Sequence, residues 1–181
     1  GYGAEVVLYD RDREDREAIA NGIAGQRGAT LVRPYDDPFV IAGQGTVGRE
    51  IAEDMTALGL SPDIVVAPAS GGGLIAGVAT AVKAKFPQAQ IIVAEPKDYD
   101  DHALSLRAGH REAHHAAGRT ICDALMAAMP GEMTFSINSK LLANGVAASD
   151  EEVGAAVAFA YREWKLVVEP GGAVGLAALL A

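Results

Sequence analysis

The chain has 181 residues and a formal net charge of −9, with 15 lysines and arginines against 24 acidic residues. Half of the residues are hydrophobic and 22% are charged, a composition typical of globular proteins that excludes a disordered chain. The acidic balance argues against nucleic acid and anionic membranes as partners. Cys122 is the single cysteine, which excludes an internal disulfide framework and leads us to expect a cytoplasmic protein. No apolar run approaches the roughly 20 residues that span a bilayer, so we expect no membrane-spanning segment.

Short apolar strands alternate with helices along the predicted chain. The expected strands cover residues 5–9, 30–32, 63–67, 90–94, 145–148 and 166–168. The expected helices cover residues 12–26, 45–58, 74–86, 102–108, 133–142, 149–165 and 172–181. Asp12 is the expected cap of the first helix, and Ser149 with Glu152 forms a capping box. Near-continuous apolar strands separated by helices indicate an α/β fold with a parallel sheet and crossover helices.

Three consecutive glycines follow the strand predicted at residues 63–67, in the run Pro68-Ala-Ser-Gly-Gly-Gly-Leu74. Glycines let successive backbone N–H groups point at one spot, and the next helix adds the positive end of its dipole. This arrangement binds a phosphate without any lysine or arginine, and Ser70 offers a hydroxyl donor. The alternative is a glycine turn that only packs the helix against the sheet, which seldom needs three glycines in a row.

A dinucleotide site is a second alternative for the same loop. The spacing Gly71-x-Gly73-x-x-Ala76 fits the dinucleotide fingerprint, and Glu95 ends the next strand, where an acid can hold a ribose. Residues 68–70 separate the strand from the first glycine, however, whereas the fingerprint glycine usually lies at the end of its strand. The fingerprint taken alone is therefore a weak indication.

Two further strand ends carry carboxylates. Residues 95–101 contain four acidic side chains, which supply hard oxygen ligands for Mg²⁺ or Ca²⁺. Acidic loops are common, so the residues alone favour a solvated loop that caps the next helix through Asp100 or Asp101. Glu169 precedes a proline and two glycines, and either faces a ligand crevice or belongs to a structural turn. The histidines at 110, 114 and 115 lie in a polar stretch without a matching ligand pattern, and we expect Cys122 to be inert.

Five motifs together resemble one family. In chain order they are YGAEVVLYD at residues 2–10, FVIAGQGT at 39–46, SGGGL at 70–74, VAEP with two aspartates at 93–101, and VVEPGGAVG at 167–175. The set resembles the threonine/serine dehydratase and serine racemase group of fold-type-II pyridoxal-phosphate enzymes, whose fold is like that of the tryptophan synthase β subunit. The resemblance runs from Tyr2 to the last residue, and five ordered motifs are far more specific than any one of them.

The resemblance implies a cofactor site and a cation site. It assigns the phosphate of pyridoxal 5'-phosphate to Ser70, Gly71, Gly72, Gly73 and Leu74, although most members of the family have glycine where Ser70 stands. It places Glu169 near the cofactor ring. It also assigns a divalent cation, Mg²⁺ or Ca²⁺, to Glu95, Asp101 and the backbone carbonyl of Tyr99, a site that favours the racemase-like branch.

The implied activity is that of a pyridoxal-phosphate-dependent lyase. The enzyme would act on a small hydroxy-amino acid to give a 2-oxo acid and ammonia, and as a full-length protein it would be a homodimer. Serine racemase and 3-hydroxyaspartate dehydratase are the alternatives within the family. The alternative of another class is a non-catalytic phosphate- or dinucleotide-binding module.

The chain contains no candidate for the catalytic lysine of the family. That residue forms the Schiff base and belongs to a Ser-Phe-Lys type motif upstream of the matching region, and Lys83 and Lys85 lie far along their helix from its phosphate end. We therefore expect the 181 residues to be an excerpt of a longer enzyme, inactive alone. Residues 1–40 would form part of the small lobe and residues 41–181 most of the large, cofactor-binding lobe.

Overall fold

The computed structural model describes residues 2–11, 13–113 and 118–181, and the chain divides into two compact units, Gly1–Arg33 and Pro34–Ala181. The first unit contains one helix, α1 (Arg16–Arg27). Asp15 caps this helix by accepting hydrogen bonds from the N–H groups of Glu17 and Ala18, so the helix begins later than expected. Asp12, the expected cap, lies outside the described residues. The division into lobes near residue 40 stays a prediction.

The strands expected at residues 5–9 and 30–32 do not form, so this part of the prediction is wrong. A strand requires a hydrogen-bonded neighbour, and no described segment of the first unit supplies one. The apolar side chains that suggested buried strands are exposed instead, including Val6 at 79% and Leu8 at 89%.

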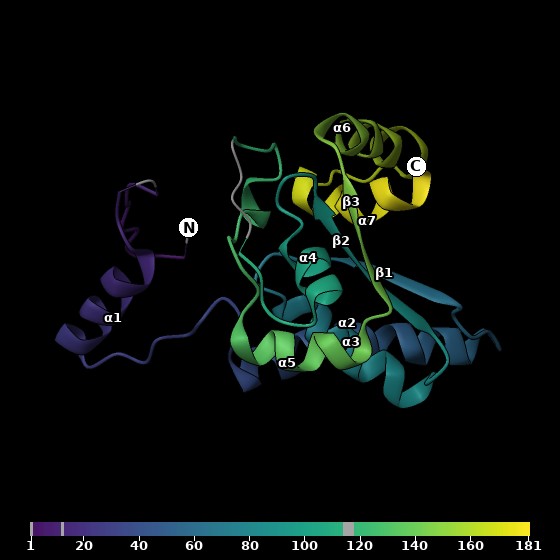
Figure 1. The fold of residues 1–181 in the computed structure, drawn as a ribbon, viewed down its shortest axis with the longest axis horizontal. Helices are drawn as coiled ribbons and strands as arrows, with labels where there is room; N and C mark the ends of the chain where they lie inside the picture. The colour runs from purple at the N-terminus through teal and green to yellow at the C-terminus, as the bar shows by residue number, and fades with distance from the viewer. Residues whose placement is uncertain (1, 12, 114–117) are drawn as a thin grey trace. The chain divides into compact units, whose positions relative to one another are not determined.

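The second unit is built on a parallel three-stranded sheet, with the order β1 (Ile64–Pro68), β2 (Gln90–Pro96) and β3 (Asn144–Ala148) (Figure 1). β2 is central and pairs in parallel with both neighbours. The three carboxyl ends therefore meet at one edge of the sheet, where ligands bind in open α/β folds. The predicted α/β fold with a parallel sheet and crossover helices is confirmed.

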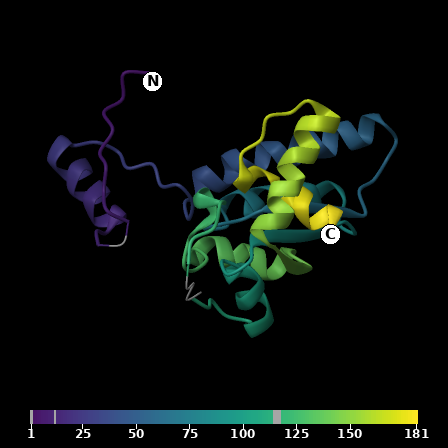
Figure 2. The same ribbon diagram turned by 90° about the horizontal axis from the view of Figure 1, so that it is seen from above.

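Helices cover both faces of this sheet. Their bounds are α2 (Pro38–Ala57), α3 (Gly73–Lys85), α4 (Asp101–Ala108), α5 (Glu132–Leu141), α6 (Asp150–Phe159) and α7 (Pro170–Leu180), with a 3₁₀ turn at Asp123–Leu125 and a π-helix at Ala160–Trp164. One buried cluster joins α3 to β1 and β2 through residues such as Ile75, Val82 and Ile91. A second cluster joins α6 and α7 to the opposite face through Val153 and Val174. Figure 2 shows the same layers from above.

In the second unit, one helix boundary and one strand differ from the prediction. α2 begins at Pro38 rather than near residue 45, because the Asp37 side chain accepts from the N–H groups of Phe39 and Val40 and the proline occupies the first turn. The strand expected at residues 166–168 is absent, and Val167 is 90% exposed. The capping box of Ser149 and Glu152 is confirmed at the start of α6. None of the helices in the described part of the chain has the length and apolar character of a membrane span.

Glycines let α2 and α3 approach closely. A Cβ atom at Gly48 would lie 2.6 Å from the carbonyl oxygen of Val78, and one at Gly77 would lie 2.5 Å from the backbone nitrogen of Gly45. Gly48→Ala or Gly77→Ala should therefore lower the free energy of unfolding by about 1–3 kcal/mol, measured by urea denaturation. Gly43→Ala in α2 is the matched control, because nothing lies within 4 Å of its added methyl group. It should be neutral or stabilise by up to about 1 kcal/mol, and an equal loss in all three variants would contradict the close-packing explanation.

Candidate functional site

The glycine loop, Ser70–Gly73, joins the carboxyl end of β1 to the first turn of α3. Gly72 occupies the N-cap position, no side chain accepts a hydrogen bond from the first turn, and that turn contains no acidic residue. The N–H groups at the start of a helix have no partner within the helix, and they carry the positive end of its dipole. The start of α3 is therefore suited to an anion.

The carbonyl groups of the loop are held by α5 and the residue before it. The hydroxyl of Thr134 donates to the carbonyl of Gly71 at 2.6 Å, and the N–H of Gly131 donates to the same oxygen at 3.1 Å. The amide of Asn138 donates to the carbonyl of Gly72 at 3.3 Å. Because C=O and the following N–H point in opposite directions in a trans peptide, the N–H groups of Gly72 and Gly73 point away from α5. The backbone thus leaves these donors available.

Close packing also explains why the loop needs glycines. Gly72 has φ of +93°, in the left-handed region, and its added Cβ would overlap the ring of His102 and lie 2.8 Å from Nδ2 of Asn138. A Cβ at Gly71 would overlap the ring of Tyr35. Packing alone therefore accounts for these two glycines, and the uncapped helix end is the feature that indicates an anion.

Ser70 is half-buried, and its hydroxyl oxygen accepts a hydrogen bond from the N–H of Ala127 at 3.1 Å. A hydroxyl that accepts one bond still has its own proton to donate. The predicted donor role of Ser70 is compatible with this geometry.

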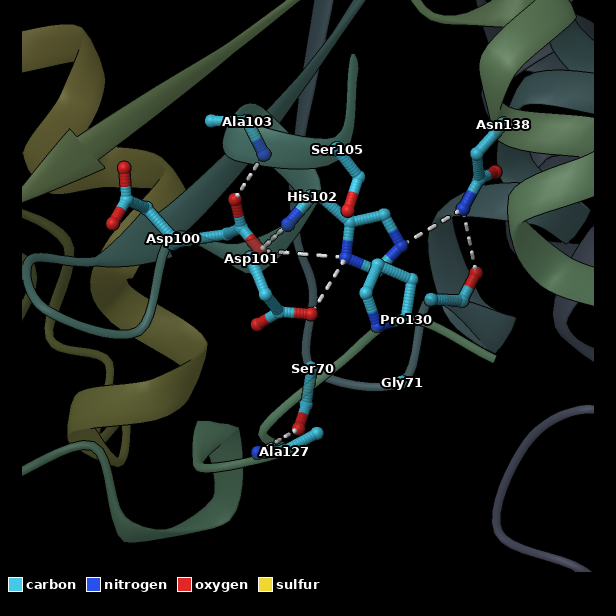
Figure 3. A network of polar contacts seen from close by, with 12 residues as sticks. Ser70, Gly71, Asp100, Asp101, His102, Ala103, Ser105, Ala127, Pro130 and Asn138 are labelled. Atoms are coloured by element: carbon cyan, nitrogen blue, oxygen red, sulfur yellow. Dashed lines mark hydrogen bonds and ion pairs between the residues drawn. The ribbon is translucent and has the colours of Figure 1, made fainter. Parts of the chain in front are cut away.

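The acidic pair, Glu95 and Asp101, is buried, since both residues are 0% exposed. The solvated acidic loop that the residues alone favoured is therefore wrong for these two carboxylates. Glu95 accepts from the N–H groups of His102 and Ala103, both at 2.9 Å, so Glu95 caps α4 in place of Asp100 or Asp101 (Figure 3). With both oxygens bound to the backbone inside the protein, Glu95 is not placed to hold a ribose, which removes the main support for the dinucleotide alternative.

The negative charge of the buried Asp101 carboxylate is poorly compensated by its described neighbours. Neither of its carboxylate oxygens has a hydrogen-bond partner, and the closest cationic candidate, Nδ1 of His102, lies 3.7 Å away. Burial, and then the negative charge of Glu95, raise the pKa of Asp101 to about 8. A divalent cation would supply the missing charge and accept the unpaired oxygens as ligands.

The composition of this site fits a cation. Ligand atoms of Glu95, Asp101 and His102 lie within 4.8 Å of one another. Tyr99, whose carbonyl is the third ligand that the resemblance implies, is half-buried in the turn between β2 and α4, and its hydroxyl donates to the carbonyl of Gly118 at 2.6 Å. The structure thus brings the predicted acids together, and it places the ring of His102 beside them, a neighbour that the sequence did not indicate.

Glu169 is exposed at the N-cap of α7, and its side chain makes no capping hydrogen bond. Its neighbour Gly171 faces Leu125, and Ala127 donates to Ser70, so residues 125–127 lie between the start of α7 and the glycine loop. No hydrogen bond joins Glu169 to the loop within the described residues, and its predicted place beside a cofactor ring stays a prediction.

The remaining polar candidates lie elsewhere. Lys83 donates to the carbonyl of Pro87 at the far end of α3. His110 pairs with Glu112 at 2.7 Å, whereas the histidines at 114 and 115 lie outside the described residues. Cys122 is buried, and burial raises the pKa of its thiol, which agrees with the expected inert role.

Comparisons with known proteins agree with this geometry. A family model described as pyridoxal-phosphate dependent enzyme matches residues 1–181. The chain is 37% identical over 179 residues to an L-threonine ammonia-lyase of Thermotoga maritima, covering 98% of the chain and 43% of that relative. It is 37% identical over 180 residues to an L-threo-3-hydroxyaspartate ammonia-lyase of Saccharomyces cerevisiae, covering 99% and 54%. The structure of maize serine racemase matches with a TM-score of 0.90 at 37% identity, covering 99% of this chain and 53% of that one.

The chain spans about half the length of the curated relatives it matches. Within that half, the backbone of the chain agrees closely with that of the solved serine racemase. Because the family match covers every residue of the chain, the chain belongs to the family of pyridoxal-phosphate dependent enzymes, with the α/β fold of its fold-type-II members.

Proposed function

We propose that the protein containing this chain is a lyase that removes the hydroxyl group and the amino group of threonine or serine, giving a 2-oxo acid and ammonia. The observation that carries the proposal is the glycine loop, where bound carbonyls on one side leave N–H groups and an uncapped helix end on the other. Pyridoxal phosphate, when bound, supplies a sink for the electrons released at the α-carbon of the substrate. The lyase relatives at 37% identity support this choice of reaction.

The residues of this chain would hold the cofactor and orient its ring. The N–H groups of residues 70–74 and the hydroxyl of Ser70 would bind the phosphate, which fixes the position of the reactive ring. Glu169 would lie near the ring at the start of α7. The catalytic lysine of the family is expected outside these 181 residues.

The acidic pair would hold Mg²⁺ or Ca²⁺ together with the carbonyl of Tyr99. The buried, unpaired oxygens of Asp101 support this site. The cation would neutralise the pair and stabilise the start of α4, and it would take no part in the reaction.

Racemisation of serine is the second candidate function. It is supported by the match to maize serine racemase and by the buried acidic pair, because the cation site favours that branch of the family. Dehydration of 3-hydroxyaspartate is supported by the yeast relative. For the full-length protein we propose a homodimer in the cytoplasm, where the buried, unpaired thiol of Cys122 stays reduced.

The test is an assay of the full-length protein loaded with pyridoxal phosphate. Formation of 2-oxo acid from L-threonine, L-serine and L-threo-3-hydroxyaspartate is compared with formation of D-serine from L-serine. The proposal predicts that 2-oxo acid from threonine or serine is the main product. D-serine as the main product would support the racemase instead, and a protein that binds the cofactor but releases no 2-oxo acid would contradict the lyase.

A further inference from the structure

A buried polar chain connects the acidic pair to the glycine loop (Figure 3). Nδ2 of Asn138 lies 3.3 Å from the carbonyl oxygen of Gly72 and 3.2 Å from Nε2 of His102. Nδ1 of the same ring lies 3.3 Å from Oε1 of Glu95 and 3.7 Å from Oδ2 of Asp101. The side chains of all four residues other than glycine are fully buried, so water does not compete for these contacts.

The hydrogen-bond donors and acceptors of this buried polar chain of side chains have one consistent assignment. The carbonyl of Gly72 only accepts, so Asn138 must face it with its NH₂ group. The same nitrogen faces Nε2 of His102, which must therefore be the acceptor. A neutral ring that accepts at Nε2 carries its proton on Nδ1, and this proton faces the acidic pair. Nδ1 of His102 therefore presents its proton to the carboxylates at 3.3 and 3.7 Å without forming a hydrogen bond, and this nitrogen is not free to bind a cation.

We propose that His102 and Asn138 are positioning residues that couple the acidic pair to the phosphate affinity of the glycine loop. A cation on Glu95 and Asp101 would fix the two carboxylates that face the unpaired Nδ1 proton and would thereby hold the ring. The ring orients the amide of Asn138, and the amide adds a second hydrogen bond to the carbonyl of Gly72, which also accepts from the N–H of Ala76 at 3.0 Å. Because that peptide group is planar, holding its carbonyl also aims the N–H of Gly73 at the anion.

This inference rests on the proposed cofactor site, and it requires reciprocity. If a cation strengthens phosphate binding by some factor, phosphate must strengthen cation binding by the same factor. If Asn138 only stabilised the fold, replacing it would leave both of these factors unchanged. The size of the coupling therefore distinguishes a positioning role from a purely structural one.

The experiment uses the full-length protein without cofactor and inorganic phosphate as the probe. Calorimetric titrations give the phosphate dissociation constant with Mg²⁺ and with chelator. We expect Mg²⁺ to tighten phosphate binding about 5- to 20-fold in the unmodified protein, within the usual range of coupling between sites. The reverse titration, Mg²⁺ with and without phosphate, should give the same factor.

Two variants remove different contacts of the buried polar chain that joins the acidic pair to the glycine loop. Asn138→Leu keeps the size of the side chain and removes both donors, and it should reduce the coupling to about onefold while Mg²⁺ still raises the melting temperature. His102→Phe keeps the ring shape and removes both nitrogens, and it should also abolish the coupling while phosphate still binds. Ser139→Ala, at the exposed neighbouring position in α5, should retain the full coupling.

The outcomes separate the two proposals. Coupling at the original level in either folded variant, or no effect of Mg²⁺ on phosphate in the unmodified protein, would overturn the inference and leave the cofactor site intact. A protein that binds no phosphate even with Mg²⁺ would contradict the proposed cofactor site as well. If Asn138→Leu does not fold, the result for His102→Phe decides.

Discussion

Replacing Gly72 with alanine should weaken phosphate binding about 10- to 100-fold in the full-length protein. The backbone of Gly72 has φ of +93°, and the new methyl group would overlap the ring of His102 and approach Nδ2 of Asn138 to 2.8 Å. Both neighbours are buried and cannot retreat, so the loop must move. Strain of about 1–3 kcal/mol at such a position corresponds to this loss of affinity if the movement misaligns the N–H donors.

Gly59→Ala is the matched control for this variant. Gly59 also has a positive φ, of +69°, but nothing lies within 4 Å of its added Cβ. It should therefore lose about 1 kcal/mol of stability and keep its phosphate affinity. Titration calorimetry with inorganic phosphate measures both variants, and unchanged binding in Gly72→Ala would show that the loop does not hold the anion.

Removing divalent cations should make the stability of the protein strongly dependent on pH. The pKa of Asp101 is raised from 3.8 to about 8 in the folded state, so the folded protein binds this proton more tightly than the unfolded chain does. The resulting stabilisation is complete below pH 3.8 and is lost as the pH rises to about 8. In chelator, the melting temperature at pH 8 should lie roughly 10 °C below the value that Asp101→Asn reaches there.

Thermal melts between pH 5 and pH 8 test this expectation, with Mg²⁺ or Ca²⁺ and with chelator. Mg²⁺ or Ca²⁺ should recover the loss in the unmodified protein, because a ligand that binds only the folded state stabilises it. Asp101→Asn should respond little to either cation. Asp98→Asn, an exposed change in the same turn, should behave as the unmodified protein does. Identical melts with cation and with chelator at every pH would leave the acidic pair without a bound ion.

Local sequence patterns were sufficient for several elements. The glycine loop, the capping box at Ser149 and the three strands of the sheet each depend on residues close together in the chain. The segments at 5–9, 30–32 and 166–168 have the same apolar character but form no strand, since pairing depends on a neighbour that the local pattern does not specify.

Local sequence patterns could not predict the buried polar chain that joins the acidic pair to the glycine loop. Asn138 lies 36 residues from His102 and 66 residues from Gly72 in sequence, and no spacing rule relates them. Composition also failed to show that Glu95 and Asp101 are buried, because the same acids in an exposed loop would give the same sequence. In this case the resemblance to a family singled out the acidic pair, and the fold explains it through the burial of the carboxyl end of β2.

A crystal structure of the full-length protein with bound pyridoxal phosphate tests the proposed cofactor site most directly. The phosphate should lie at the start of α3, within hydrogen-bond distance of the N–H groups of residues 70–74, with the carbonyls of Gly71 and Gly72 still bound by Thr134 and Asn138. A phosphate bound elsewhere, with these N–H groups facing away from it, would contradict the assignment of the glycine loop.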